Sequence, residues 1–231
     1  SLSNTAMIIL QSSVTGTTYA EKAASLSNTA KIILQSSTSG TTSADKATSL
    51  SNTAKIIGQS ATKDPGKAAD IILQSSTSGT TLADKAASLS KTADIIVQST
   101  SIFAGATSDM VSQMVTKDLT TAVYVMGQLI TINVAADSTK AAGNLLNTMT
   151  ITSAAKTMQN LPDLKLEQVV PAISPAALVQ RLPEITPDKQ SKVSDQVLLS
   201  ALTVGGKLVV PTEQITKEVQ PTTPTGIQTP T

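Results

Sequence analysis

Pairs of adjacent isoleucines recur along the first hundred residues, separated by stretches of small polar residues. The pairs lie at positions 8–9, 32–33, 56–57, 71–72 and 95–96, so their spacing is 24, 24, 15 and 24 residues. The nonapeptide SLSNTAKII occurs twice, at 25–33 and 49–57, and each copy ends in one of these pairs, while the closely similar SLSNTAMII opens the chain. A period of this length is typical of proteins built from repeated structural units.

The apolar positions of one unit have the spacing of a helix. Ala47, Leu50, Ala54 and Ile57 are separated by three, four and three residues, which places them on one stripe of an α-helix. Two other units repeat this stripe, at Ala23, Leu26, Ala30 and Ile33 and at Ala86, Leu89, Ala93 and Ile96. We therefore expect the second isoleucine of each pair to lie on the seam between packed helices.

Polar residues mark where these helices begin and end. Thr18, Thr42 and Thr81 are each followed three residues later by an acid, which is the capping-box pattern. Asp64-Pro65 predicts another start. Three glycines are expected to end the preceding helices as left-handed C-caps, namely Gly16, Gly40 and Gly79. The predicted helices cover approximately 1–12, 18–36, 42–60, 65–75 and 82–103.

Amphipathic helices without a repeat are predicted next. One follows Thr116-Lys-Asp, and the others are expected to start near Asp109, Asp137 or Ser138, and Ser153. Beyond Leu161 prolines punctuate the chain, and Ser174-Pro175 and Thr186-Pro187 are typical helix starts. A Gly-Gly turn beside a short extended piece is expected in 203–211, and a flexible Pro/Thr-rich tail in 211–231.

The sequence therefore predicts an all-α protein. Antiparallel helical hairpin repeats with a period of about 24 residues would pack on a non-repetitive helical region. The expected divisions are a repeat region 1–104, a helical core 105–160, short Pro-punctuated helices 161–210 and a tail or linker 211–231. A disordered Ser/Thr-rich tract is the alternative for the first hundred residues, but isoleucine pairs in phase with caps favour helices.

Composition narrows the possible functions. The chain has 231 residues, a net charge of +1, a single Arg, and no Cys, His or Trp. Thiolate and imidazole chemistry is therefore impossible for this chain, and scattered lysines do not form a phosphate-binding face. We expect no nucleic-acid partner. The longest apolar run, 122–136, contains Gln128 and Asn133 and is shorter than the ~20 residues that span a bilayer, so no membrane span is expected.

Three acids adjoin apolar helices and are the candidates for acid–base chemistry: Asp109, Asp118 and Asp137. Each lies near a predicted helix start, where a carboxylate accepts hydrogen bonds from free backbone N–H groups. Capping is the favoured interpretation. We therefore expect no enzymatic activity, no metal and no cofactor.

One segment resembles a known family. Asp118-Leu-Thr-Thr-Ala-Val123, followed by Gly143-Asn-Leu-Leu-Asn-Thr-Met149, is similar to the helical segments ahead of the autoproteolysis domain of animal adhesion receptors. The similarity covers about 35 of the 231 residues, and the His of that family's cleavage motif is absent. The resemblance implies an extracellular architecture.

These observations favour a non-enzymatic structural protein, such as a spacer, stalk or self-assembling subunit outside a cell or on a particle surface. The alternatives are an extracellular adhesion or ligand-binding helical module and, less favoured, a membrane-active helical toxin. The expected partner is another copy of the chain or another protein. Candidate packing or self-association residues are Leu26, Ile33, Leu50, Ile57, Ile72, Leu89, Ile96, Leu119, Val123, Met126 and Leu129.

Overall fold

The computed structural model describes residues 2–131 and 136–194, and these residues form helices and no strand. The all-α prediction is therefore confirmed for this part of the chain. Its helices are α1 (Leu2–Ser12), α2 (Tyr19–Ser36), α3 (Ser43–Lys63), α4 (Pro65–Ser76), α5 (Leu82–Ile102), α6 (Ala104–Lys117), α7 (Leu119–Thr131), α8 (Ala136–Thr148), α9 (Ile151–Asn160), α10 (Asp163–Val169) and α11 (Pro175–Arg181). The described part of the chain also contains two 3₁₀ turns, Val170–Ala172 and Leu182–Glu184, and a helical segment at 187–194.

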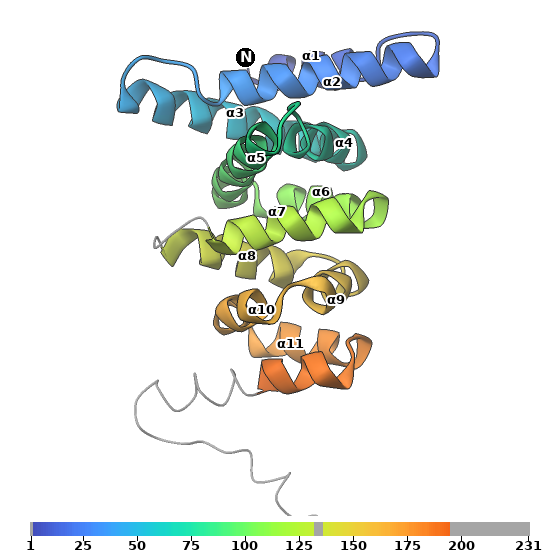
Figure 1. The fold of residues 1–231 in the computed structure, drawn as a ribbon, viewed down its shortest axis with the longest axis vertical. Helices are drawn as coiled ribbons and strands as arrows, with labels where there is room; N and C mark the ends of the chain where they lie inside the picture. Colours follow the sequence, from blue (N-terminus) through green and yellow to red (C-terminus); the bar gives the residue numbers. More distant parts are fainter. Residues whose placement is uncertain (1, 132–135, 195–231) are drawn as a thin grey trace, which may run out of the picture.

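Successive helices run antiparallel and alternate between two layers. In one layer α1, α3, α5 and α7 stack on one another, and in the other α2, α4, α6 and α8 do so. The stack extends along the longest axis of the molecule, from α1 and α2 at one end to α11 near the other (Figure 1). Each of the helices α3 to α6 thus buries one side against the helix two places before it and the other side against the helix two places after it.

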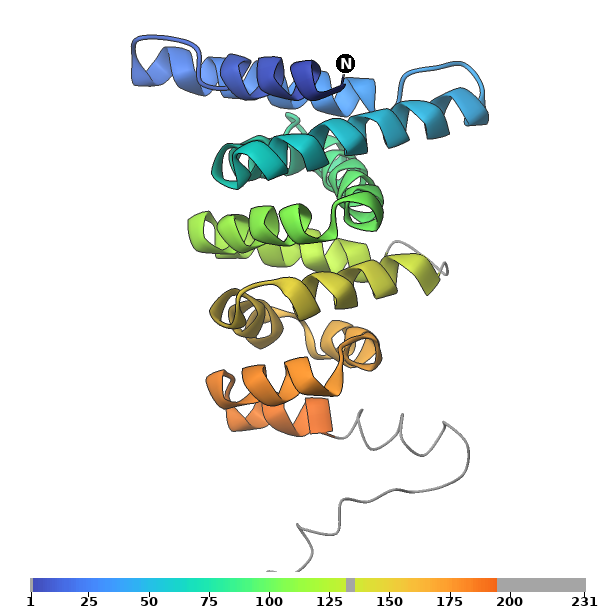
Figure 2. The same ribbon diagram turned by 180° about the vertical axis from the view of Figure 1, so that it is seen from behind.

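The repeat unit is a single helix with its loop, as the predicted helices at 18–36 and 42–60 imply. Helix α2 has 18 residues and α3 has 21, so a helix and its loop use the whole period. Consecutive units lie in opposite layers, and a hairpin therefore takes two units. The loops between α1, α2 and α3 extend beyond the stack (Figures 1 and 2).

Five of the predicted helix starts are confirmed. Thr18, Thr42 and Thr81 form capping boxes with Glu21, Asp45 and Asp84, at the starts of α2, α3 and α5. Asp64 accepts a hydrogen bond from the Lys67 backbone, and Ser174 accepts one from Ala177. These starts were predictable because a cap and the backbone it satisfies are close in sequence.

The predicted glycine C-caps are wrong. Helix α2 ends at Ser36, and the Ser37 hydroxyl donates to the Leu34 carbonyl at 2.9 Å, so serine satisfies the helix end. Gly40, with φ +117°, instead packs against the next helix start, where an added Cβ would lie 2.3 Å from Cβ of Asp45. Gly16 and Gly79 repeat this arrangement at Glu21 and Asp84. Glycine is needed because the loop backbone passes directly over the capping acid.

One other predicted start is wrong. Asp109 is an exposed residue inside α6, which begins at Ala104 immediately after α5. The connection is so short because the Phe103 ring packs over Gly58, which turns the chain without a polar loop. Asp118 does begin α7, where it accepts hydrogen bonds from the Thr121 backbone at 3.0 Å and from the Thr121 hydroxyl at 2.6 Å.

The core runs continuously along the stack, from Leu10 in α1 to Val193 in the last described helix. It crosses the predicted divisions at 104 and 160, and the proposed domain boundaries remain predictions. The second isoleucine of the pair is at most 1% exposed at Ile33, Ile57, Ile72 and Ile96, and partly buried at Ile9. The turn and extended piece predicted in 203–211 and the tail lie outside the described residues.

Candidate functional site

Grooves open between stacked helices at three places, and equivalent residues of the repeat line them. Leu26, Leu50 and Leu89 each precede a fully buried isoleucine of the stripe by seven residues. All three are only partly buried, and each lines one groove. The position is partly exposed because the first turns of α2, α3 and α5, at 19–24, 43–48 and 82–87, project beyond the stack and are exposed.

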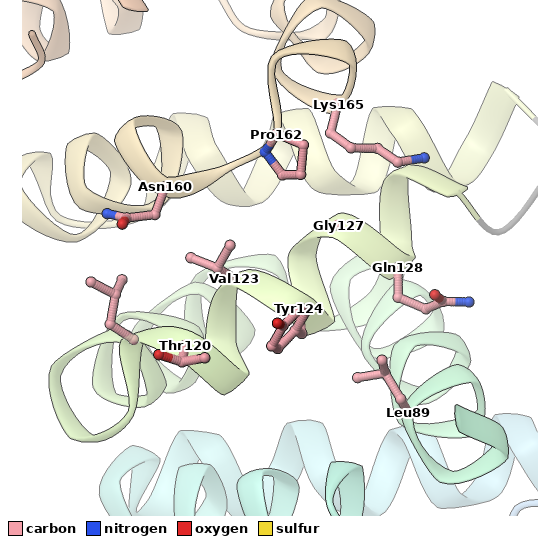
Figure 3. A pocket seen from close by; sticks show the side chains of 10 residues that line it. Leu89, Thr120, Val123, Tyr124, Gly127, Gln128, Asn160, Pro162 and Lys165 are labelled. Atoms are coloured by element: carbon pink, nitrogen blue, oxygen red, sulfur yellow. The ribbon is translucent and has the colours of Figure 1, made fainter. Parts of the chain in front are cut away.

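The largest groove, about 480 Å³, lies over α7. We call it the α7 groove. Its residues come from α5, α7, the end of α9 and the start of α10 (Figure 3). They are Leu89, Leu119, Thr120, Val123, Tyr124, Gly127, Gln128, Asn160, Pro162 and Lys165. The Val123 side chain lies between the Thr120 side of α7 and the Asn160–Pro162 segment, and Gln128 and Lys165 lie toward the other end (Figure 3).

The floor of the α7 groove is apolar and its rim is polar. Leu119 and Val123 are partly buried and pack on the core, directly beside the fully buried Met126. Tyr124 is 65% exposed, which is unusual for an aromatic side chain beside such a surface. The polar groups that line it are hydroxyls, amides and one lysine ammonium, and no carboxylate is among them.

Two smaller grooves have a charged lining. Helices α2 and α4 form one of about 290 Å³, with Lys22, Leu26 and Asp70, and α3 and α5 form one of about 210 Å³, with Lys46, Leu50 and Asp94. Corresponding residues are 24 positions apart in the two grooves. Both acids directly precede an isoleucine pair.

Tyr124 takes the place of these acids in the α7 groove. It directly precedes Val125 and Met126, which are fully buried in α7 as Ile71 and Ile72 are in α4. The offset of 54 residues also aligns the cap Asp118 with the cap Asp64. The same structural position thus carries a carboxylate in two grooves and an aromatic ring in the third, which leaves the third groove without a carboxylate.

The two carboxylates have different surroundings. Asp70 forms an ion pair with Lys117 of α6, with 2.7 Å between Oδ1 and Nζ. Burial raises the pKa of Asp94, and within the described residues no hydrogen bond or ion pair reaches its carboxylate. Because the other titratable residues in that groove are Lys46 and Lys91, the groove lacks the second acid that paired-carboxylate chemistry needs.

The eleven candidate packing residues fall into two groups. Six are fully buried and hold helices of this chain together: Ile33, Ile57, Ile72, Ile96, Met126 and Leu129. Five are partly buried, and each lines a groove: Leu26, Leu50, Leu89, Leu119 and Val123. Self-association through any of them remains a prediction. No local pattern in the sequence indicates the contributions of Asn160, Pro162 and Lys165, since α9 and α10 reach the groove only through tertiary packing.

Within residues 2–131 and 136–194, no three metal-ligating side chains come together. In the same ranges, every helix is too short or too polar to cross a bilayer.

No protein-family model, curated protein or solved structure matches the chain. Any functional proposal therefore depends on the geometry of the chain itself.

Proposed function

We propose that this chain is a non-enzymatic helical scaffold that binds a segment of another protein in the α7 groove. The observation that supports this most directly is the apolar floor of that groove, left open between α5, α7 and α10 beside an exposed tyrosine. Tyrosine is among the residues that are enriched in binding hot spots. Known ligand clefts occupy roughly 300–1,000 Å³, and the α7 groove falls inside this range.

The lining indicates the chemistry of the bound segment. Leu119 and Val123 offer contacts to one or two aliphatic or aromatic side chains, and Tyr124 can close over them. Lys165 is the charged residue of the lining, so a carboxylate next to the apolar side chains would be favoured. We therefore expect a segment with two apolar residues and a neighbouring Asp or Glu.

Gly127 provides the sharpest test of this proposal. It lies in the middle of α7 and lines the groove, and the nearest atom to an added Cβ is Cδ2 of Leu161 at 4.0 Å. Gly127→Leu therefore places a side chain in the groove without disturbing the helix, because leucine is a good helix former. Loss of binding in this variant would report an occupied groove, not an unfolded chain.

The experiment is a selection of binding peptides from a random dodecamer library on the full chain. We expect enriched peptides to carry two apolar residues and an acid, and Gly127→Leu to weaken their binding at least about tenfold. Val179→Ala is the control, since Val179 is 69% exposed on α11 and does not line the groove. Peptides that bind Gly127→Leu as tightly as the parent would contradict the proposal.

A spacer or stalk is the second candidate function. It is favoured by the elongated stack, in which helices are added along one axis (Figure 1). An extracellular or particle-surface location belongs to this proposal. Negative-stain imaging tests it, because filaments or large assemblies are expected for a self-assembling subunit and single rods of one length for a binding module.

A further inference from the structure

The outer side of α1 and α2 exposes isoleucines at positions where other units bury them. Ile8 is 60% exposed and Ile32 is 56% exposed, and Met7 beside Ile8 is 45% exposed. The equivalent first isoleucines of α4 and α5, Ile71 and Ile95, are both 0% exposed. We call the outer side of α1 and α2 the end face. It lies far from the α7 groove along the stack (Figure 2).

A close contact shows which side of a helix this position occupies. The Ser75 hydroxyl of α4 donates to the Ile71 carbonyl of its own helix at 2.7 Å, and the same hydroxyl oxygen lies 3.5 Å from the Ala30 carbonyl oxygen of α2. Ser75 follows Ile71 by four residues, so both lie on the side of α4 that faces the preceding helix of its layer. The equivalent sides of α1 and α2 therefore point out of the stack.

The serine four residues after the first isoleucine of each pair is likewise more exposed in α1 and α2 than in the other units. Ser60, Ser75 and Ser99 are 0% exposed, whereas Ser36 is partly buried and Ser12 is exposed. Exposure of the serine thus rises only in α1 and α2, where the preceding helix of the layer is missing, whereas the first isoleucine is also partly exposed in α3, at Ile56. The end face has the surface of an internal helix contact.

The end face also lacks the polar character of a capping helix. Residues 1–20 contain no charged residue, and Met7 stands where the equivalent units carry Lys31 and Lys55. Terminal units of repeat proteins need a polar outer side to remain soluble. An uncharged side with exposed Met7, Ile8 and Ile32 does not meet that need.

We propose that the end face binds a further antiparallel pair of units of this same repeat, which continues the two layers. The complementary surface is already present in the molecule, because α1 stacks on α3. The covered side of α3 carries Ile56 and Ser60, the same residue types as Ile8 and Ser12 of α1. An added pair of helices with the sequence of α1 and α2 would therefore pack on the end face in the same way that α1 packs on α3 and α2 packs on α4. This inference is independent of the α7 groove.

The test is an extended chain that carries a tandem copy of residues 1–48 ahead of Ser1. The new junction, Thr48 followed by Ser1, reproduces the natural sequence Thr48-Ser49-Leu50. We expect amide hydrogen exchange in residues 4–12 and 28–36 to become at least about tenfold slower than in the parent chain. Unchanged exchange there would overturn the proposal.

Matched variants separate stacking from other effects. Ile8→Asp with Ile32→Asp should leave the melting temperature of the 231-residue chain unchanged, because both side chains are exposed, but should abolish the added protection in the extended chain. Equal protection with and without these substitutions would overturn the proposal. Sedimentation of the parent chain is the last check. If the parent chain forms a dimer that Ile8→Asp with Ile32→Asp dissociates, then the end face binds a second whole copy of the chain. That result would also overturn the proposal.

Discussion

Gly58 illustrates how a single residue can depart from the repeat for a structural reason. The residue after the isoleucine pair is Leu10, Leu34 or Leu73 in three other units, but at Gly58 the Phe103 ring fills the space. An added Cβ would lie 2.2 Å from Cδ2 of that ring. Glycine here permits the direct turn from α5 into α6.

Gly58→Ala is therefore expected to lower the free energy of unfolding. Alanine favours a helix over glycine by about 1 kcal/mol, but overpacking a filled site costs roughly 1–3 kcal/mol, so the steric cost should exceed the gain. Gly127→Ala is the matched control, because its Cβ would make only an ordinary contact, 4.0 Å from Cδ2 of Leu161, so that only the gain applies. Urea unfolding measures both variants, and a Gly58→Ala chain as stable as Gly127→Ala would contradict the packing described here.

Sequence reasoning at this scale found the buried isoleucines but missed the residues that depend on distant partners. Helical spacing places Ile57 and Ile96 inward regardless of what they meet. Nothing local to Gly58 indicates Phe103, and nothing local to Arg181 indicates its role. Arg181 is 2% exposed and donates hydrogen bonds to the Asn147 and Met149 carbonyls, which ties α11 to the turn after α8.

At the scale of helices, the capping boxes link stability to pH. The Glu21 carboxylate accepts hydrogen bonds from the Thr18 and Thr17 backbones, and these lower its pKa from 4.5 to about 2. Hydrogen bonds from Thr42 and Thr81 lower the pKa values of Asp45 and Asp84 in the same way. Folding therefore favours the charged carboxylates, and their contribution is fully present above pH 4.5 and is lost as pH falls toward 2.

The expected result is earlier fraying of α2, α3 and α5 in acid. Amide exchange in 19–24, 43–48 and 82–87, referenced to the intrinsic rate at each pH, should show less protection at pH 3 than at pH 6. The variant Glu21→Gln, Asp45→Asn, Asp84→Asn should show the weaker protection at both values. A parent chain with equal protection at the two pH values would contradict the role assigned to the carboxylates.

The predicted ends of α1, α2, α4 and α5 lie within one residue of the observed ends, whereas α3 continues to Lys63, beyond the predicted end at 60. The starts were predictable because a threonine with an acid three residues later contains its own partner. The role of Gly40 was not predictable either. The Ser37 hydroxyl satisfies the end of α2, so Gly40 is not needed as a C-cap. Local hydrogen bonds that compete with glycine cannot be ranked from the sequence alone.

At the scale of the molecule, the sequence predicted one helix for each 24-residue unit and antiparallel neighbours, but not the two stacked layers. Stacking between helices two places apart creates the α7 groove from α5, α7 and α10. The groove was not predictable because α10 meets α7 only through this tertiary packing.

The central claim is that the repeated isoleucines hold a stack of one-helix units in which the first turns of α2, α3 and α5 remain outside. Amide hydrogen exchange of the full chain, resolved by peptide, tests this most directly. The account predicts that segments 29–35, 53–58 and 92–97 exchange about a hundredfold more slowly than 19–24, 43–48 and 82–87. Uniformly fast exchange over both sets would show a disordered Ser/Thr-rich tract and contradict the stack.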